Sequence, residues 1–135
     1  MNKPEPRVNE ISQQFWDGLN EGHIHLQRCL DETCGRMVFY PRVCCPFCHG
    51  AGLEWLSASG HGKVISHTTV HRPHHDGFGG EIPYVFAAIE LTEGVLVYGQ
   101  MQGAPTCGTS LINRSVQAIF DDRGVKQKVL SFQLV

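Results

Sequence analysis

Cysteines at metal-ligand spacing are the strongest chemical signal in this sequence. They form two close pairs, with four residues inside the first pair, ten residues between the pairs and two residues inside the second. The four are Cys29, Cys34, Cys45 and Cys48. Structural zinc sites use such pairs, because each pair lies on a tight turn and one metal ion joins the two turns. Gly35 and Pro46 favour these turns, since glycine relaxes the backbone and proline stiffens it.

The choice of the third ligand depends on two adjacent cysteines, Cys44 and Cys45. We predict Cys45, because two residues separate it from Cys48 and because neighbouring side chains in an extended segment point in opposite directions. His49 is an alternative ligand. Iron competes with zinc for a tetrahedral site of four sulfurs. Either way, four thiolates leave no open coordination position, so we expect a structural metal, with Zn²⁺ as the cofactor.

Histidines near the middle of the chain offer a second kind of chemistry. The residues concerned are His67, His71, His74, His75 and Asp76. Histidines beside a carboxylate could form a second metal site or a general base. Their loop is rich in glycine, however, and gives poor support to a catalytic arrangement, so we interpret it as a solvated loop. Cys107 lacks an orienting partner in its own segment, and the pair Asp121-Asp122 lies in a turn. We therefore predict no catalytic residues.

The cysteine segment follows a predicted amphipathic helix that begins near Val8 and Asn9 and stops at Gly22. The apolar positions are Val8, Ile11, Phe15 and Leu19, which fall on one face, with Trp16 beside them. Two interpretations stay open for this stripe. It packs on its own domain, or Phe15, Trp16 and Leu19 bind another subunit.

The remainder of the chain has a β pattern throughout. Short β-like runs alternate with the cysteine turns over residues 24–56, and five strands separated by Gly, Pro, Asp and Asn follow over residues 57–135. In the last strand, Leu130, Phe132 and Leu134 alternate with Ser131 and Gln133, which predicts one buried and one exposed face. Five short strands favour a small closed barrel. We predict three parts: a lead-in and helix at 1–23, a metal ribbon at 24–56 and a barrel at 57–135.

Composition and charge exclude several classes of function. The chain has 135 residues with a net charge of −2, and no segment carries an excess of basic residues. A barrel of this kind could stack nucleotide bases on Tyr84, Phe86 and Tyr98, but it lacks the cationic groove that single strands need. No apolar run approaches the ~18 residues that span a bilayer. The first residues lack the apolar stretch of a secretion signal, so we expect a cytoplasmic protein that uses no membrane and no nucleic acid.

A series of short motifs gives the chain a family resemblance from about residue 10 to its end. In order they are Phe15-Trp16-Asp17-Gly18-Leu19, Leu26-Gln27-Arg28-Cys29, Cys34-Gly35, Tyr40-Pro41-Arg42, Cys45-Pro46-Phe47-Cys48, Leu53-Glu54-Trp55, Ser59-Gly60-His61-Gly62-Lys63-Val64 and His71-Arg72-Pro73. Together they resemble the DUF35 family. This resemblance implies an amino-terminal helix, a rubredoxin-like zinc ribbon and a carboxy-terminal OB-fold, with zinc on the four cysteines named above. The spacer between Cys29 and Cys34 is wider than the two residues common in the family.

The resemblance also implies a function. Members of the family are typically partners of acyl-CoA enzymes, particularly of thiolase-fold proteins. We therefore expect a non-catalytic accessory subunit of a ketothiolase, acyltransferase or aldolase complex. This subunit would bind and stabilise a thiolase-fold catalytic subunit, with acyl-CoA at the shared interface. Two alternatives stay open: an OB-fold that carries acyl-CoA by itself, using Arg72, Arg114 or Lys126 for its phosphates, and a module that binds single-stranded nucleic acid.

Overall fold

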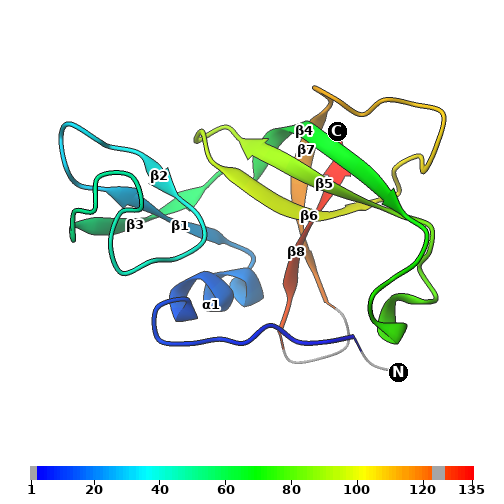
Figure 1. Ribbon diagram of the computed structural model, residues 1–135, viewed down its shortest axis with the longest axis horizontal. Helices are drawn as coiled ribbons and strands as arrows, with labels where there is room; N and C mark the ends of the chain where they lie inside the picture. The colour runs from blue at the N-terminus through cyan, green and yellow to red at the C-terminus, as the bar shows by residue number, and fades with distance from the viewer. Residues whose placement is uncertain (1–2, 123–126) are drawn as a thin grey trace.

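The chain folds into a small three-stranded sheet, one helix and a closed barrel, as the computed structural model shows (Figure 1). The structure describes residues 3–122 and 127–135. The helix and the ribbon strands are α1 (Gln13–Glu21), β1 (Ile24–Cys29), β2 (Met37–Val38) and β3 (Leu53–Ala58). The barrel strands are β4 (His61–Val70), β5 (Tyr84–Leu91), β6 (Leu96–Gln102), β7 (Ser115–Asp121) and β8 (Val129–Leu134), with a short 3-10 turn, η1 (Asp76–Phe78), between β4 and β5. The predicted fold class, mainly β with an amino-terminal helix, a zinc ribbon and a five-stranded OB-like barrel, is confirmed.

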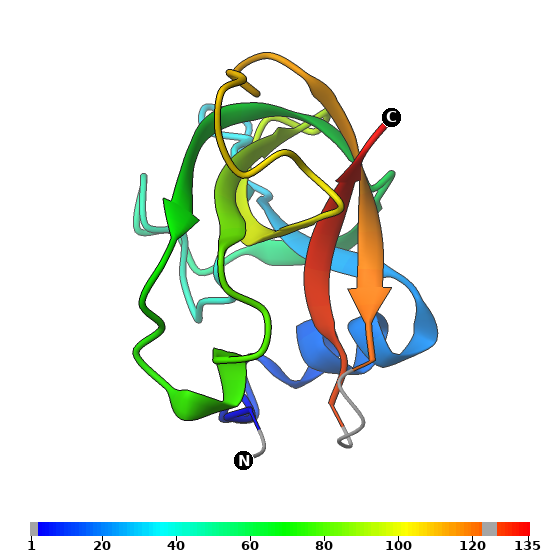
Figure 2. The same cartoon turned by 90° about the vertical axis from the view of Figure 1, so that its right-hand side faces the viewer.

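The barrel closes in the order β4-β5-β6-β8-β7. All its neighbouring strands are antiparallel except β6 and β8, which run parallel. Strand β4 joins both edges of the sheet, because residues 61–63 pair with β7 and residues 62–70 pair with β5. Gly62 permits the close approach of β5, since a Cβ there would lie 2.5 Å from the carbonyl oxygen of Glu90. In Figure 2, β7 and β8 lie side by side and the segment between β4 and β5 extends beyond the barrel as a loop.

The helix begins later than the sequence predicts. Asn9 caps the turn that leads into it: the Asn9 side chain accepts a hydrogen bond from the Ser12 N–H at 2.9 Å, and the Ser12 hydroxyl accepts one from the Asn9 N–H at 3.1 Å. This reciprocal pair has the pattern of a capping box and lies one turn ahead of Gln13, where the regular helix begins. Val8 and Ile11 therefore lie outside the helix and are exposed. The predicted stop is correct, because Gly22 adopts a left-handed φ of 84° that suits glycine.

The helix packs on its own chain, which favours the first of the two interpretations of its apolar stripe over binding of Phe15, Trp16 and Leu19 to another subunit. Phe15 and Leu19 are 2% and 0% exposed. They share one core with Ile24 and Leu26 of β1 and with the barrel interior. A partner could reach them only if the core opened. Trp16 is half-buried, and its indole N–H donates to the Tyr40 hydroxyl at 2.7 Å within the chain.

The last strand departs from simple alternation at one residue. Leu130 and Phe132 are buried, Leu134 is half-buried and Gln133 is exposed, as expected. Ser131, however, is fully buried. The alternation therefore does not hold at Ser131, in a strand that the helix α1 contacts.

Among the described residues, no helix is both long and apolar enough to cross a bilayer.

Replacing Leu19 with alanine tests whether the helix belongs to the core. We expect the free energy of unfolding to fall by about 2–5 kcal/mol, because a fully buried leucine leaves a cavity. Ile11→Ala is the matched control, since Ile11 is exposed and should change stability by less than about 0.5 kcal/mol. Urea unfolding of the zinc-loaded protein measures both, and equal losses for the two variants would contradict this assignment.

Candidate metal centre

The first cysteine turn is built around Asp31. Cys29 ends β1, and the backbone N–H groups of Cys34 and Gly35 donate to the Asp31 carbonyl at 3.0 and 2.9 Å. The Asp31 carboxylate also accepts hydrogen bonds from the N–H and the hydroxyl of Thr33, at 2.9 and 2.7 Å. These bonds fold the wide four-residue spacer into a compact turn. This role of Asp31 was not predicted, although the Asp-x-Thr pattern is a known signal for such a turn.

The second turn follows a similar plan. The His49 N–H donates to the Cys45 carbonyl at 2.9 Å, and the Cys45 N–H donates to the Gly50 carbonyl at 2.9 Å. Two further backbone N–H groups approach sulfur: that of Phe47 lies 3.4 Å from Cys45 Sγ and that of Gly50 lies 3.4 Å from Cys48 Sγ. Backbone donors of this kind stabilise thiolates, so the turn prepares both sulfurs to bind a cation.

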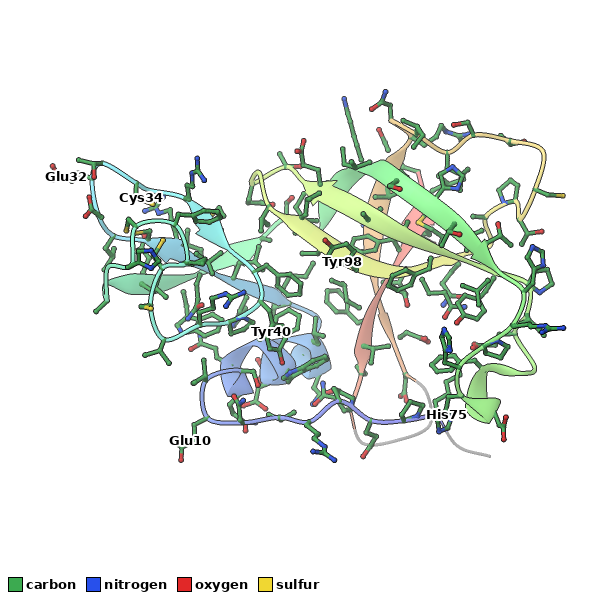
Figure 3. The ribbon with its side chains drawn as sticks, viewed as in Figure 1. Glu10, Glu32, Cys34, Tyr40, His75 and Tyr98 are labelled. Atoms are coloured by element: carbon green, nitrogen blue, oxygen red, sulfur yellow. The ribbon has the colours of Figure 1, made fainter. Side chains whose placement is uncertain are left out.

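The two turns bring the sulfurs of Cys29, Cys34, Cys45 and Cys48 within 4.8 Å of one another (Figure 3, which labels Cys34). Cys29 Sγ lies 3.5 Å from Cys48 Sγ, and Cys34 Sγ lies 3.7 Å from Cys45 Sγ. A tetrahedral zinc ion with Zn–S bonds of about 2.3 Å places its sulfurs about 3.8 Å apart, so this spacing fits the ion. It is far too long for a disulfide, and all six cysteines are free. These four cysteines are positioned to bind a metal ion, as a structural zinc requires.

The acidities of the thiols explain why the cluster favours a cation. Burial raises the pKa of Cys45, but the backbone N–H groups of Cys48 and Phe47 outweigh it and bring this pKa down to about 7. The backbone N–H of Asp31 lowers the pKa of Cys29, but burial and the neighbouring sulfurs raise it to about 12. One thiolate therefore forms readily and opposes ionisation of its neighbours. A divalent ion removes this opposition by neutralising their charge.

The other candidate ligands lie outside this cluster. Cys44 is exposed and lines a surface hollow with Pro41 and Arg42, while its neighbour Cys45 is fully buried. His49 adopts a left-handed φ of 65° at the end of the second turn and does not join the four sulfurs.

The histidine loop does not assemble a second centre in the part of the chain that the structure describes. His67 accepts a hydrogen bond from the Leu111 N–H at 3.1 Å through Nε2, and His75 accepts one from the Gly77 N–H at 3.0 Å through Nδ1. Both rings thus hold backbone in place. Cys107 is exposed in the loop between β6 and β7. Asp121 and Asp122 do not both lie in the turn that the sequence predicts, because Asp121 is the last residue of β7 and Asp122 follows it.

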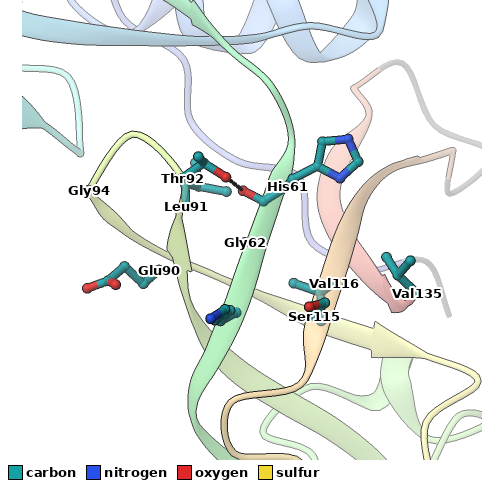
Figure 4. A pocket seen from close by; sticks show the side chains of 10 residues that line it. His61, Gly62, Glu90, Leu91, Thr92, Gly94, Ser115, Val116 and Val135 are labelled. Carbon is teal, nitrogen blue, oxygen red and sulfur yellow. Dashed lines mark hydrogen bonds between the residues drawn. The ribbon is translucent and has the colours of Figure 1, made fainter.

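An open hollow of about 420 Å³ lies on the barrel where β4 begins (Figure 4). His61, Lys63 and Ser115 are among the residues that line it, and the Thr92 hydroxyl donates to the His61 carbonyl at 2.9 Å. Arg72 and Arg114, named above for CoA phosphates, are exposed and do not line this hollow, and Lys126 lies outside the described residues.

Comparisons with known proteins place the chain in a family. The profile of the ChsH2 rubredoxin-like zinc ribbon domain matches residues 16–54, and that of the ChsH2 C-terminal OB-fold domain matches residues 55–112. A solved structure described as "Ltp2-ChsH2(DUF35) aldolase" superposes with a TM-score of 0.82 and 26% identity, covering 96% of this chain and 98% of that one. The chain belongs to the DUF35 family. Its zinc ribbon is therefore a family feature as well as a geometric one.

Curated relatives of this DUF35 protein have several kinds of name. A "Probable enoyl-CoA hydratase alpha subunit" of Thermomonospora curvata is 32% identical over 75% of this chain and 30% of the relative. A "DUF35 domain-containing scaffold protein" of Methanothermobacter thermautotrophicus is 40% identical over 55% of this chain and 54% of the relative. A "Benzoylsuccinyl-CoA thiolase subunit BbsA" of Thauera aromatica is 33% identical over 58% and 51%, respectively. The chain thus spans about half or less of the length of these relatives.

Adjacent cysteines provide a matched test of the ligand set. We expect Cys45→Ser to lower the zinc content well below one ion per chain, because Cys45 is one of the four clustered sulfurs. Cys44→Ser should keep the wild-type content, since Cys44 is exposed and outside the cluster. Elemental analysis of the two purified variants measures zinc and iron together, and loss of metal from Cys44→Ser alone would contradict the assignment.

Zinc affinity should fall as the pH is lowered. Cys29, with a pKa raised to about 12, must lose its proton to bind zinc, so lower pH favours the protonated, metal-free form. We expect apparent affinity to weaken about tenfold per pH unit for each proton displaced. Competition with a zinc chelator at pH 8 and pH 6 measures this change, and equal affinities at the two values would rule out the displacement of thiol protons.

Proposed function

We propose that the chain is a non-catalytic accessory subunit of a thiolase-type acyl-CoA enzyme, which docks on the catalytic subunit and stabilises it. The observation that carries this proposal is the superposition over nearly the whole chain on the DUF35 component of an aldolase. The names of the relatives support it, since they include subunits of a hydratase and a thiolase and a scaffold protein.

The chemistry of the metal centre supports the same proposal. Four sulfurs complete the tetrahedral shell of zinc, so the ion has no position left for water or substrate. Two of the four histidines that we considered for catalysis, His67 and His75, accept hydrogen bonds from backbone N–H groups. A chain built in this way contributes shape and surface to an assembly, and the reacting groups belong to the partner.

We extend the proposal to the substrate and the compartment. The acyl-CoA of the catalytic subunit would lie at the shared interface, because the named activities of the relatives concern CoA esters. The complex would operate in the reducing cytoplasm, where a thiolate-bound zinc and two further cysteines without disulfides persist.

Reconstitution tests the proposal. Purification of the tagged chain from its native cells, followed by mass spectrometry, identifies the stoichiometric partner, and the two proteins are then produced separately and mixed. We expect a thiolase-fold subunit that binds the chain in a fixed ratio. At a chain concentration of 100 times Kd, the partner should gain about 2.7 kcal/mol of stability. Its thermal unfolding temperature and its activity on an acyl-CoA should both rise.

The isolated chain provides the control for that experiment. It should turn over no thioester by itself, and zinc-free chain should fail to stabilise the partner. Thioester turnover by the isolated chain would contradict an accessory role. Tight binding of CoA to the chain alone would favour the acyl-CoA carrier. Salt-dependent binding of a single-stranded oligonucleotide would favour the nucleic-acid alternative.

A further inference from the structure

Large apolar side chains are exposed where the ribbon meets the barrel. We name this surface the junction face and define it by four residues. They are Phe47, Phe86, Leu96 and Tyr98, which are 51%, 43%, 42% and 54% exposed. Between the ribbon and β6 the surface is hollowed by about 300 Å³, with Phe39 and Phe47 on one side and Leu96 and Tyr98 on the other. Figure 3 shows Tyr40 and Tyr98 at this junction.

Strand alternation explains why these side chains point outward. In β6, Val97 is fully buried in the barrel, so Leu96 and Tyr98 on either side of it face outward. In β5, Phe86 stands between the buried Val85 and Ala87. Tyr98 pairs with Ala88, which places Phe86 diagonally next to it on the same face. The fold therefore does not need these side chains for its core.

The ribbon contributes Phe47 through the second cysteine turn. Its backbone N–H approaches Cys45 Sγ at 3.4 Å, so the metal centre fixes the position from which the ring projects. Arg36 lies over this ring, with its guanidinium carbon 4.6 Å from the ring centroid. At the other end, Glu90 pairs with Leu96 and is exposed. The face thus has an apolar centre with one charge of each sign at its rim, which is the anatomy of a protein interface.

We propose that the junction face is the surface on which the catalytic subunit docks, an inference that rests on the proposed function. Four half-exposed side chains of this size present on the order of 400 Å² of apolar surface. A stable interface buries about 800 Å² on each partner, so the face supplies half of that area as its apolar centre. The face also runs continuously over ribbon and barrel, the two domains that together superpose on the DUF35 component of an aldolase.

Other occupants fit less well. Small-molecule sites enclose most of their ligand, whereas here the rings stand out from a shallow hollow. A single-stranded nucleic acid needs several cations beside the aromatic rings, whereas among the described residues Arg36 is the one cation that lies over a ring of this face. A second copy of this chain remains as an outcome that the experiment below distinguishes.

The test uses the catalytic subunit identified by reconstitution and measures its Kd for variants of the full-length chain. We expect the double variant Leu96→Ala/Tyr98→Ala to raise Kd by at least about 30-fold, because centrally placed apolar anchors dominate interface energies. Phe47→Ala should independently raise Kd by at least about tenfold from the ribbon side. Ile112→Ala is the matched control, since Ile112 is 45% exposed but lies in the loop between β6 and β7. Its Kd should stay within about threefold of wild type.

Zinc content and far-UV circular dichroism confirm that each variant is folded, and sedimentation of the isolated chain reports self-association. Wild-type Kd values for both the double variant and Phe47→Ala would overturn the junction face as the docking surface while leaving the accessory role intact. A wild-type chain that binds no thiolase-fold subunit would overturn the proposed function and this inference together. A wild-type chain that dimerises by itself, and that the double variant makes monomeric, would assign the face to a second copy instead.

Discussion

The ribbon depends on four sulfurs, because it has almost no hydrophobic core of its own. Its separate buried cluster consists of Cys29, Val38 and Cys45, with Cys34 and Leu53 packed against it. Three of these five residues are cysteines, so the metal and the core of the ribbon occupy the same place. Segments this small rarely fold without a staple, and zinc binding in comparable peptides contributes about 10–16 kcal/mol. The shape of the ribbon, and with it the position of Phe47, therefore follows from metal binding.

The helix and β1 connect the ribbon to the barrel. Ile24 and Leu26 of β1 share one core with Phe15 and Leu19 of the helix and with the interior of the barrel. This shared core holds the two domains in one orientation. Within the ribbon, the Gln27 side chain donates to the Arg42 carbonyl at 3.0 Å and accepts from the Arg42 N–H at 2.7 Å, which ties the following loop to β1. A surface that runs over both domains, such as the junction face, keeps its shape before a partner arrives, which reduces the entropy lost on binding.

Local patterns in the sequence predicted what depends on neighbours along the chain. The spacing of the cysteines indicated the two turns, the alternation of apolar residues indicated the five barrel strands, and Gly22 marked the end of the helix. Two local details were not predicted. The Asn9 cap lies on the turn before the regular helix and not on the helix itself, and Asp31 folds the wide spacer that the sequence presented as an irregularity. Both concern short polar side chains, which can bond to several nearby backbone groups.

The amino-acid sequence by itself determined the type of each element and the chemistry of the metal centre, because helical period, strand alternation and ligand spacing act over a few residues. Only the tertiary structure decided which apolar surfaces are free. Phe15 and Leu19 are apolar residues that a partner could have covered, but they pack on β1 and the barrel core, and Ser131 is buried although strand alternation predicts that it is exposed. Leu96 and Tyr98 stay exposed because nothing in the described chain packs over the outer face of β6 at that point. The exposure of a side chain depends on contacts with segments far away in the sequence, and a local sequence pattern carries no information about those contacts.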